Sequence, residues 1–117
     1  MTDLRAADCP FCRVAAGELP AEVVRESAGA VAFRDLAPQA PTHVLVVPRT
    51  HHQDVGALAA ADPGLLAELV ALTKAVAADE GLEAYRLVFN TGAGAGQSVF
   101  HVHGHVFGGR PMRWPPG

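Results

Sequence analysis

The sequence predicts an α+β domain built on an antiparallel sheet of about five strands, with one long and one short helix. Short apolar runs separated by Gly and Pro indicate the strands. One stretch with helical periodicity, GLLAELVALTKAVAA, indicates the long helix. The elements follow the order helix, strands, helix, strands, which favours an antiparallel sheet. The length of 117 residues suits a single domain.

The first half of the chain predicts the short helix and three strands. CPFCRVAAGELP (residues 9–20) is expected to form a short helix or turn that ends near its glycine. AEVVRES (21–27) and GAVAFRD (29–35) are expected to be strands joined by a tight turn. HVLVVPR (43–49) is a strongly apolar strand that follows a proline-rich loop.

The second half predicts the long helix and two more strands. The helix is expected over residues 62–78, with Asp62 as its N-cap and Gly81 closing its C-terminal end. YRLVFNT (85–91) and VFHVHGHVF (99–107) are expected to be strands, connected by the flexible turn GAGAG. Leucine and valine at helical spacing give the helix one buried face: Leu65, Leu69, Leu72 and Val76.

The charge and the terminal sequence exclude several classes of protein. The formal net charge is −3, whereas general nucleic-acid binders have a basic excess, so we expect no nucleic-acid partner. The N-terminal MTDLRAADCP has acidic residues and no apolar leader, and Glu68 and Lys74 interrupt the apolar helix. We therefore expect a cytoplasmic protein with no membrane span, whose two cysteines are reduced or metal-bound.

A histidine-rich segment, QSVFHVHGHVFGGR (97–110), contains the main candidates for catalytic residues. Alternate residues of a strand share one face, so His101, His103 and His105 are expected to lie together, opposite the apolar face of the same strand. Three neighbouring imidazoles repel one another when protonated, which separates their pKa values. Such an arrangement can place a neutral nucleophile beside a proton donor.

Other interpretations of this segment are a surface strand that happens to carry histidine, and a catalytic metal site. Metal-dependent barrels with His-x-His need about 250 residues. A cupin-like site would need a carboxylate shortly after the histidines, and FGGRPMRW contains none.

The pattern His-φ-His-φ-His-φ-φ resembles the signature of the histidine triad (HIT) superfamily. FRDLAPQAPTHVLVVP, GQSVFHVHGHVFGGR and the ending WPPG are similar, in the same order, to the branch of histidine triad nucleotide-binding proteins. The resemblance covers nearly the whole chain. It implies a single HIT domain over residues 1–117, a homodimer whose two sheets join, and a C-terminal tail (108–117) near the active site.

The resemblance implies a purine nucleoside phosphoramidase, which hydrolyses the P–N bond of adenosine or guanosine 5′-phosphoramidates through a nucleotidyl-histidine intermediate. By position, His103 is the nucleophile, and His105 contacts the phosphate or assists proton transfer. His101 and His43 support the triad, and Ser98 contacts the leaving group or a phosphate oxygen. No cofactor is required for this reaction. The alternatives are a nucleoside polyphosphate hydrolase, and a nucleotide-binding or scaffold module with incidental catalysis.

The resemblance also implies a nucleotide site. Asp35 would bind the ribose hydroxyls, although a loop cap explains it equally well, and Asn90 would lie near the ribose and phosphate or cap a turn. Gly96 and Gln97 would bring backbone N–H groups to the phosphate, and the alternative is a mobile hairpin loop. Trp114 would shape the leaving-group side. The apolar base slot, whose members are otherwise ordinary core residues, would consist of Phe11, Val14, Leu19, Phe33 and Leu36.

The two cysteines form a Cys-x-x-Cys pair, Cys9 and Cys12, without the βαβ context of a redox motif. Tetrahedral zinc needs four N or S ligands, and His51 and His101 are the best candidates for the other two, with His52 a weaker substitute for His51. Some bacterial members of the superfamily carry this set as a structural zinc site. The alternative is two buried thiols that pack as small apolar groups.

One residue departs from the resembled pattern. The family prefers a bulky apolar residue between the second and third histidines, where this chain has Gly104. Glycine in a strand weakens packing and adds backbone freedom, so it is expected to loosen the site.

Overall fold

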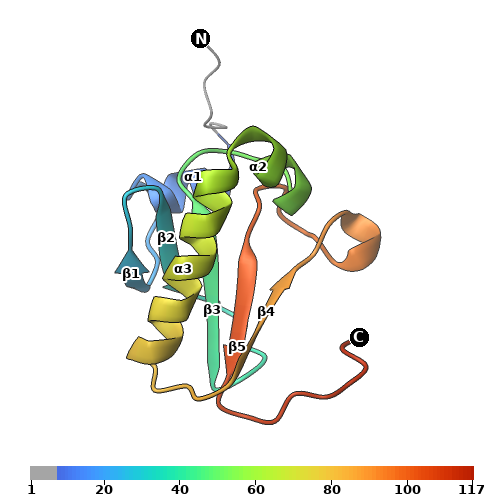
Figure 1. Ribbon diagram of the computed structural model, residues 1–117. Helices are drawn as coiled ribbons and strands as arrows, with labels where there is room; N and C mark the ends of the chain where they lie inside the picture. Colours follow the sequence, from blue (N-terminus) through green and yellow to red (C-terminus); the bar gives the residue numbers. More distant parts are fainter. Residues whose placement is uncertain (1–7) are drawn as a thin grey trace.

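The computed structural model describes residues 8–117, so the expectation that the chain begins without a leader falls largely outside the described residues. Its centre is a five-stranded antiparallel sheet in the order β1-β2-β3-β5-β4 (Figure 1). The strands are β1 (Val23–Glu26), β2 (Ala30–Arg34), β3 (Thr42–Pro48), β4 (Tyr85–Phe89) and β5 (Gly104–Gly108). The helices are α1 (Pro10–Ala15), α2 (Val55–Ala61), α3 (Pro63–Asp79) and a short 3₁₀ turn, η1 (Ala93–Ala95).

The α+β class, the five antiparallel strands and the long helix are confirmed. Asp62 caps α3 by accepting a hydrogen bond from the Leu65 N–H, as the sequence predicted. Helix α2 is an addition, because the prediction had only one short helix. Its N-cap is Asp54, which accepts from the N–H of Ala57. A capped run of seven mostly small residues has too little periodicity to be recognised as a helix from sequence.

The predicted final strand over residues 99–107 is wrong in its first half, since β5 begins only at Gly104. The register pairs Val46 with Gly104, which would bring Pro48 opposite Val102 if pairing continued. Proline has no N–H to donate, so the ladder stops there. The Val102 N–H bonds instead to the His52 carbonyl at 2.7 Å. His101 and His103 therefore precede the strand, and only His105 lies within it.

Helix α3 covers one face of the sheet (Figure 1). Its buried leucines and valine pack against apolar side chains from the three central strands, in a cluster that includes Leu69, Leu72, Val76, Val44 and Val106. Within residues 8–117, no helix combines the length and apolar character that crossing a bilayer would require. The opposite face of the sheet is only partly covered, by α1 over β2 and β3. The rest of that face, over β5 and β4, is left for a functional site.

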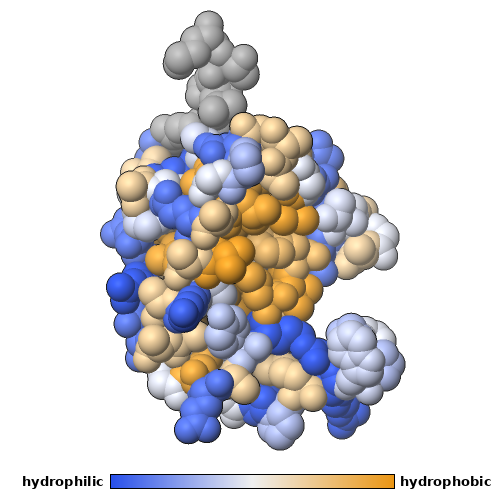
Figure 2. All heavy atoms as spheres, in the orientation of Figure 1, coloured by the Kyte–Doolittle hydropathy of each residue, from blue (hydrophilic) through white to orange (hydrophobic). Residues whose placement is uncertain are grey.

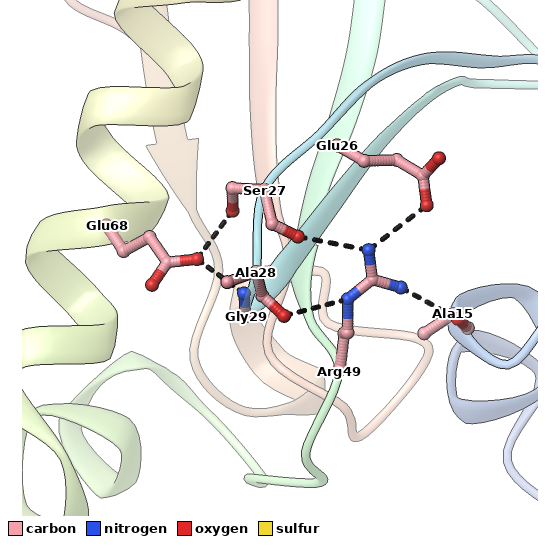
Figure 3. A network of polar contacts seen from close by, with 7 residues as sticks. All are labelled: Ala15, Glu26, Ser27, Ala28, Gly29, Arg49 and Glu68. Atoms are coloured by element: carbon pink, nitrogen blue, oxygen red, sulfur yellow. Dashed lines mark hydrogen bonds and ion pairs between the residues drawn. The ribbon is translucent and has the colours of Figure 1, made fainter.

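Two charged residues fix the β1–β2 turn and helix α1 relative to the sheet (Figure 3). Glu68 of α3 accepts from the Ser27 hydroxyl and the Gly29 N–H. Arg49, just after β3, donates to the carbonyls of Ser27 and Ala28, to Glu26, and to the Ala15 carbonyl at the end of α1. Because Arg49 joins α1 to the end of β3, it holds the helix that carries the cysteine pair.

Gly104 was expected to loosen the site, but its surroundings are tightly packed. A Cβ at this position would lie 2.7 Å from a Leu87 methyl, 3.0 Å from Val46 and 3.1 Å from Phe89. Neighbouring side chains therefore fill the space that a side chain at this position would need. The glycine is a packing requirement of this particular core.

We expect Gly104→Val to destabilise the protein by about 1–3 kcal/mol, because the added methyl groups would overpack this contact. Chemical unfolding monitored by circular dichroism measures the change. Gly94→Ala is the matched control, since nothing lies within 4 Å of its Cβ position. Equal stability of Gly104→Val and the native chain would show that Leu87 and Phe89 repack freely.

Candidate active site

The face of the sheet opposite α3 gathers polar and aromatic side chains in rows that cross the strands. The register pairs His105 of β5 with Leu45 of β3 on one side and with Val88 of β4 on the other. The next row pairs Phe107 with His43 and Arg86. Paired residues point to the same side of a sheet, so these rows form one continuous surface. Three of the four predicted catalytic histidines, His43, His103 and His105, meet on it.

His103 has a fixed ring orientation. Its Nδ1 lies 2.8 Å from the backbone carbonyl of His101, and only 8% of the residue is exposed. A carbonyl only accepts, so Nδ1 must carry the proton, and Nε2 keeps its lone pair. The ring of Phe11 contacts the imidazole edge-on, with ring centroids 4.9 Å apart. In the neutral ring, Nε2 of His103 is therefore a preoriented nucleophile.

A second chain of hydrogen bonds fixes the tautomers of His43 and His105. The Gln39 backbone N–H donates to His43 Nδ1 at 3.1 Å, so neutral His43 carries its proton on Nε2. His43 Nε2 lies 2.9 Å from His105 Nδ1 and donates to it. His105 must then carry its proton on Nε2. His103 thus offers a lone pair and His105 an N–H group, and the centroids of these two rings are 5.0 Å apart.

Burial favours the neutral forms of His105 and His43. Desolvation, assisted by the neighbouring His103 and His43, lowers the pKa of His105 to about 4. Desolvation also lowers the pKa of His43, and the nearby Asp35 opposes that shift only in part. His105 is therefore a neutral hydrogen-bond donor near pH 7 and has no excess proton to give away.

Asp35, His43 and His105 bring their ligand-type atoms within 4.8 Å of one another, but they do not fit a metal. A metal on His43 Nε2 would force its proton to Nδ1, where the Gln39 N–H already donates. Asp35 is partly engaged as well. One of its oxygens caps the loop by accepting from the Ala37 N–H at 2.8 Å, and the other lies 3.4 Å from His43 Nε2.

An apolar pocket of about 260 Å³ lies beside the triad, between α1 and the strands β2 and β3. Its walls contain all five residues predicted for the base slot: Phe11, Val14, Leu19, Phe33 and Leu36. Leu36 is fully exposed at the mouth, and Asp35 lies next to it on the rim. Phe11 links the pocket to the nucleophile, because its ring lines the pocket and also contacts His103.

The structure of the loop before the triad differs from the prediction that the Gly96 and Gln97 N–H groups face the phosphate. The N–H groups of Gly96 and Gln97 donate to the carbonyls of Ala93 and Gly92, so they are used inside the loop and do not form an anion nest. The buried Gln97 side chain fastens the loop, accepting from the Gly92 N–H and donating to the carbonyls of Gln53 and Val99. A glycine-rich loop predicts mobility, but the buried amide of Gln97 closes it into an ordered turn.

Three predicted site residues lie apart from the base slot. Ser98 is exposed in a shallow pocket beside Cys9 and His51. Asn90 lines a groove on the β4 side of the triad. Trp114 is 83% exposed, and its place on the leaving-group side of a site across a dimer stays a prediction. The tail reaches the site through Arg110, whose Nε donates to the Gln39 carbonyl.

His101 belongs to a different cluster from the other histidines. Its side chain is fully buried, with Nδ1 3.4 Å from the sulfur of Cys9 and 3.4 Å from that of Cys12. His51 Nδ1 lies 3.5 Å from Cys12 Sγ, and the four ligand atoms are all within 4.8 Å of one another. His52 is excluded from this set because its Nε2 bonds to the Thr50 hydroxyl. The predicted metal set is thereby brought together.

The geometry of this cluster fits tetrahedral zinc. With Zn–S of about 2.3 Å and Zn–N of about 2.05 Å, adjacent S and N ligands of a tetrahedron lie about 3.5 Å apart. Three of the four sulfur–nitrogen distances are 3.4, 3.4 and 3.5 Å. His101 Nε2 donates to the Pro48 carbonyl at 2.8 Å, which leaves the Nδ1 lone pair for the metal. Burial lowers the pKa of His101 to about 4, so the ligand is already deprotonated.

Gln39 and Pro48 are functional positions that the sequence analysis missed. Both act through the backbone, Gln39 by its N–H to His43 and Pro48 by its carbonyl to His101. A backbone role leaves no signature in residue type.

Comparison with known proteins identifies the family to which the chain belongs. The HIT domain family matches residues 16–112. An uncharacterised HIT-like protein of Synechococcus elongatus is 46% identical over 94% of this chain and 97% of its own length. The 14 kDa zinc-binding protein of Zea mays is 44% identical over 92% of this chain and 86% of its own.

Solved structures agree with the sequence relatives. A HIT family hydrolase from Legionella pneumophila superposes with a TM-score of 0.89 at 48% identity, covering 94% of this chain and all of that one. A histidine triad protein from Clostridium difficile superposes with a TM-score of 0.88 at 32% identity, covering 93% of this chain and 96% of that one. Both the sequence and the fold of the chain therefore make it a member of the HIT domain family.

Proposed function

We propose that the protein is a hydrolase of purine nucleoside 5′-phosphoramidates that works through a nucleotidyl-histidine intermediate. The observation that carries the proposal is the pair of fixed tautomers, a lone pair at His103 Nε2 beside an N–H at His105 Nε2, next to an apolar slot. The hydrolase description of the Legionella relative supports the reaction class.

In the first step His103 Nε2 attacks the α-phosphorus, and the P–N bond to the amine breaks. The leaving nitrogen takes up one proton, supplied by solvent, and departs as the amine. His103 becomes a phosphorylated imidazolium, whose Nδ1–H remains bonded to the His101 carbonyl. In the second step water attacks the phosphorus, His103 leaves as the neutral ring, and one proton is released.

The neighbouring residues would hold the nucleotide during these steps. Neutral His105 would donate its Nε2–H to a non-bridging phosphate oxygen, where charge develops. The base would enter the slot beside Phe11, and Asp35 on its rim would accept the ribose hydroxyls. Ser98 and Asn90 would contact the leaving group and phosphate. Aminoacyl adenylates would be secondary substrates, because they present the same adenylyl group.

Hydrolysis of a fluorogenic adenosine 5′-phosphoramidate tests the proposal. We expect steady turnover, with AMP and the free amine as products. Faster hydrolysis of diadenosine polyphosphates would instead identify a nucleoside polyphosphate hydrolase. Tight AMP binding without turnover of either substrate would identify a nucleotide-binding or scaffold module.

We also propose that two copies of this HIT domain associate through the β4 edge. Strand β4 is the last of the sheet, so one side of its backbone is unpaired. Figure 2 shows apolar side chains gathered beside α3 over this part of the sheet, where Leu66, Leu87 and Phe89 are only partly buried. In such a dimer the exposed Trp114 would extend towards the partner's site. A structural zinc held by thiolates favours a cytoplasmic location.

A further inference from the structure

The β4 side of the triad has a groove of about 580 Å³ that is lined by three arginines, Arg86, Arg110 and Arg113. It lies across the triad from the base slot. The sheet order puts β2 and β3, which carry the slot, on one side of β5, and β4 on the other. The register places Arg86 beside Phe107, in the row next to His105.

The groove adjoins the triad through residues that contact its histidines. Phe107 lines it, and the ring of Phe107 stacks parallel to that of His105 with centroids 5.8 Å apart. Gln39 also lines it and donates to His43 through its backbone N–H. A nucleotide whose base occupies the slot and whose phosphorus lies at His103 would therefore direct its leaving group into this groove.

The charge of the groove is unusual for this protein. The chain has a net charge of −3, and the arginines outside the groove at positions 25, 34 and 49 each pair with carboxylates. In the groove, no Asp or Glu side chain of residues 8–117 contributes to the lining. Arg86 donates to the Arg113 carbonyl, and Arg110 donates to those of Gln39 and Pro111. These carbonyl partners orient the guanidinium groups, which outnumber the C-terminal carboxylate that Gly117 brings to the lining.

We infer that this groove is a leaving-group subsite that selects anionic leaving groups, such as amines that carry a carboxylate, or a further phosphate. Guanidinium groups bind carboxylate and phosphate oxygens through charge-assisted hydrogen bonds. The inference rests on the proposed function for its reaction, but the anion site itself can be measured by binding alone.

The kinetic test uses adenosine 5′-phosphoramidates of β-alanine and β-alaninamide, which differ in leaving-group charge and hardly in size. We expect kcat/KM to be on the order of 10-fold higher for the β-alanine compound at low ionic strength, and the preference to shrink with salt. Arg86→Gln and Arg113→Gln should each reduce the ratio several-fold. Arg25→Gln is the matched control, because it removes the same charge on β1, where Arg25 pairs with Asp79.

The binding test compares ADP with AMP by calorimetry, because the β-phosphate of ADP would occupy the leaving-group position. We expect ADP to bind several-fold more tightly than AMP, with the advantage lost in Arg86→Gln and Arg113→Gln and kept in Arg25→Gln. Equal affinities for ADP and AMP in the native protein would overturn the subsite, whether or not phosphoramidates are hydrolysed. An ADP advantage without phosphoramidate turnover would keep the subsite and overturn only the proposed reaction.

Discussion

His103→Asn is expected to reduce kcat for an adenosine phosphoramidate by about 10⁴-fold or more, because covalent catalysis fails completely without its nucleophile. Asparagine can still donate from its amide to the His101 carbonyl, which in the native protein accepts from His103 Nδ1 at 2.8 Å. It offers no nitrogen lone pair to phosphorus. The variant therefore tests the nucleophile with little disturbance of the surrounding hydrogen bonds.

The affinity for AMP separates a chemical loss from a structural one. The base slot is built from side chains of α1, β2 and the loop after β2, so AMP binding to His103→Asn should stay within a few-fold of native. Quenched-flow trapping should detect a labelled phosphohistidine in the native protein and none in the variant. His52→Asn serves as a control outside the site, and it should retain native kcat. Near-normal turnover by His103→Asn would refute the covalent mechanism.

Much of the fold could be predicted because helix caps, glycines and prolines mark the ends of its helices and strands. Asp62 and Gly81 delimit the long helix, and apolar runs between Gly and Pro mark every strand. Helix α2 was missed because its alanines carry no amphipathic pattern. The start of β5 depended on the position of Pro48 in a neighbouring strand, and strand register is not visible before the sheet is assembled.

The candidate site was predictable in its residue types and in the roles that the resemblance implied, but not in its geometry. Alternation placed three histidines on one face of a strand, yet His101 turns to the cysteines, as its predicted metal role requires, while His103 and His105 face the open side of the sheet. The tautomers are set by the backbone groups of Gln39 and His101, which any residue could supply. The arginine groove is lined by β4 and by the C-terminal tail, which lie more than twenty residues apart in the sequence. No local sequence pattern could therefore predict it.

The second large effect is expected at the cysteine–histidine cluster. Purified protein that has never met a chelator should contain about one zinc per chain if the four ligands close a tetrahedral site. Cys12→Ser should lose that zinc, because Cys12 is 1% exposed and its sulfur faces both His51 and His101. The melting temperature should fall by more than about 10 °C, since losing a structural zinc removes several kcal/mol of folding free energy.

A pair of adjacent histidines provides the matched control for zinc. His51→Asn removes a ligand, whereas His52→Asn changes a residue whose side chain bonds to Thr50 instead. Elemental analysis and thermal unfolding should therefore separate the two, with zinc and stability lost only in His51→Asn. A fully ligated ion has no open position for substrate, so zinc-depleted protein that remains folded at low temperature should keep turning over. Native protein without metal, or a His51→Asn protein as stable as His52→Asn, would leave the cluster as a packed pair of thiols beside two imidazoles.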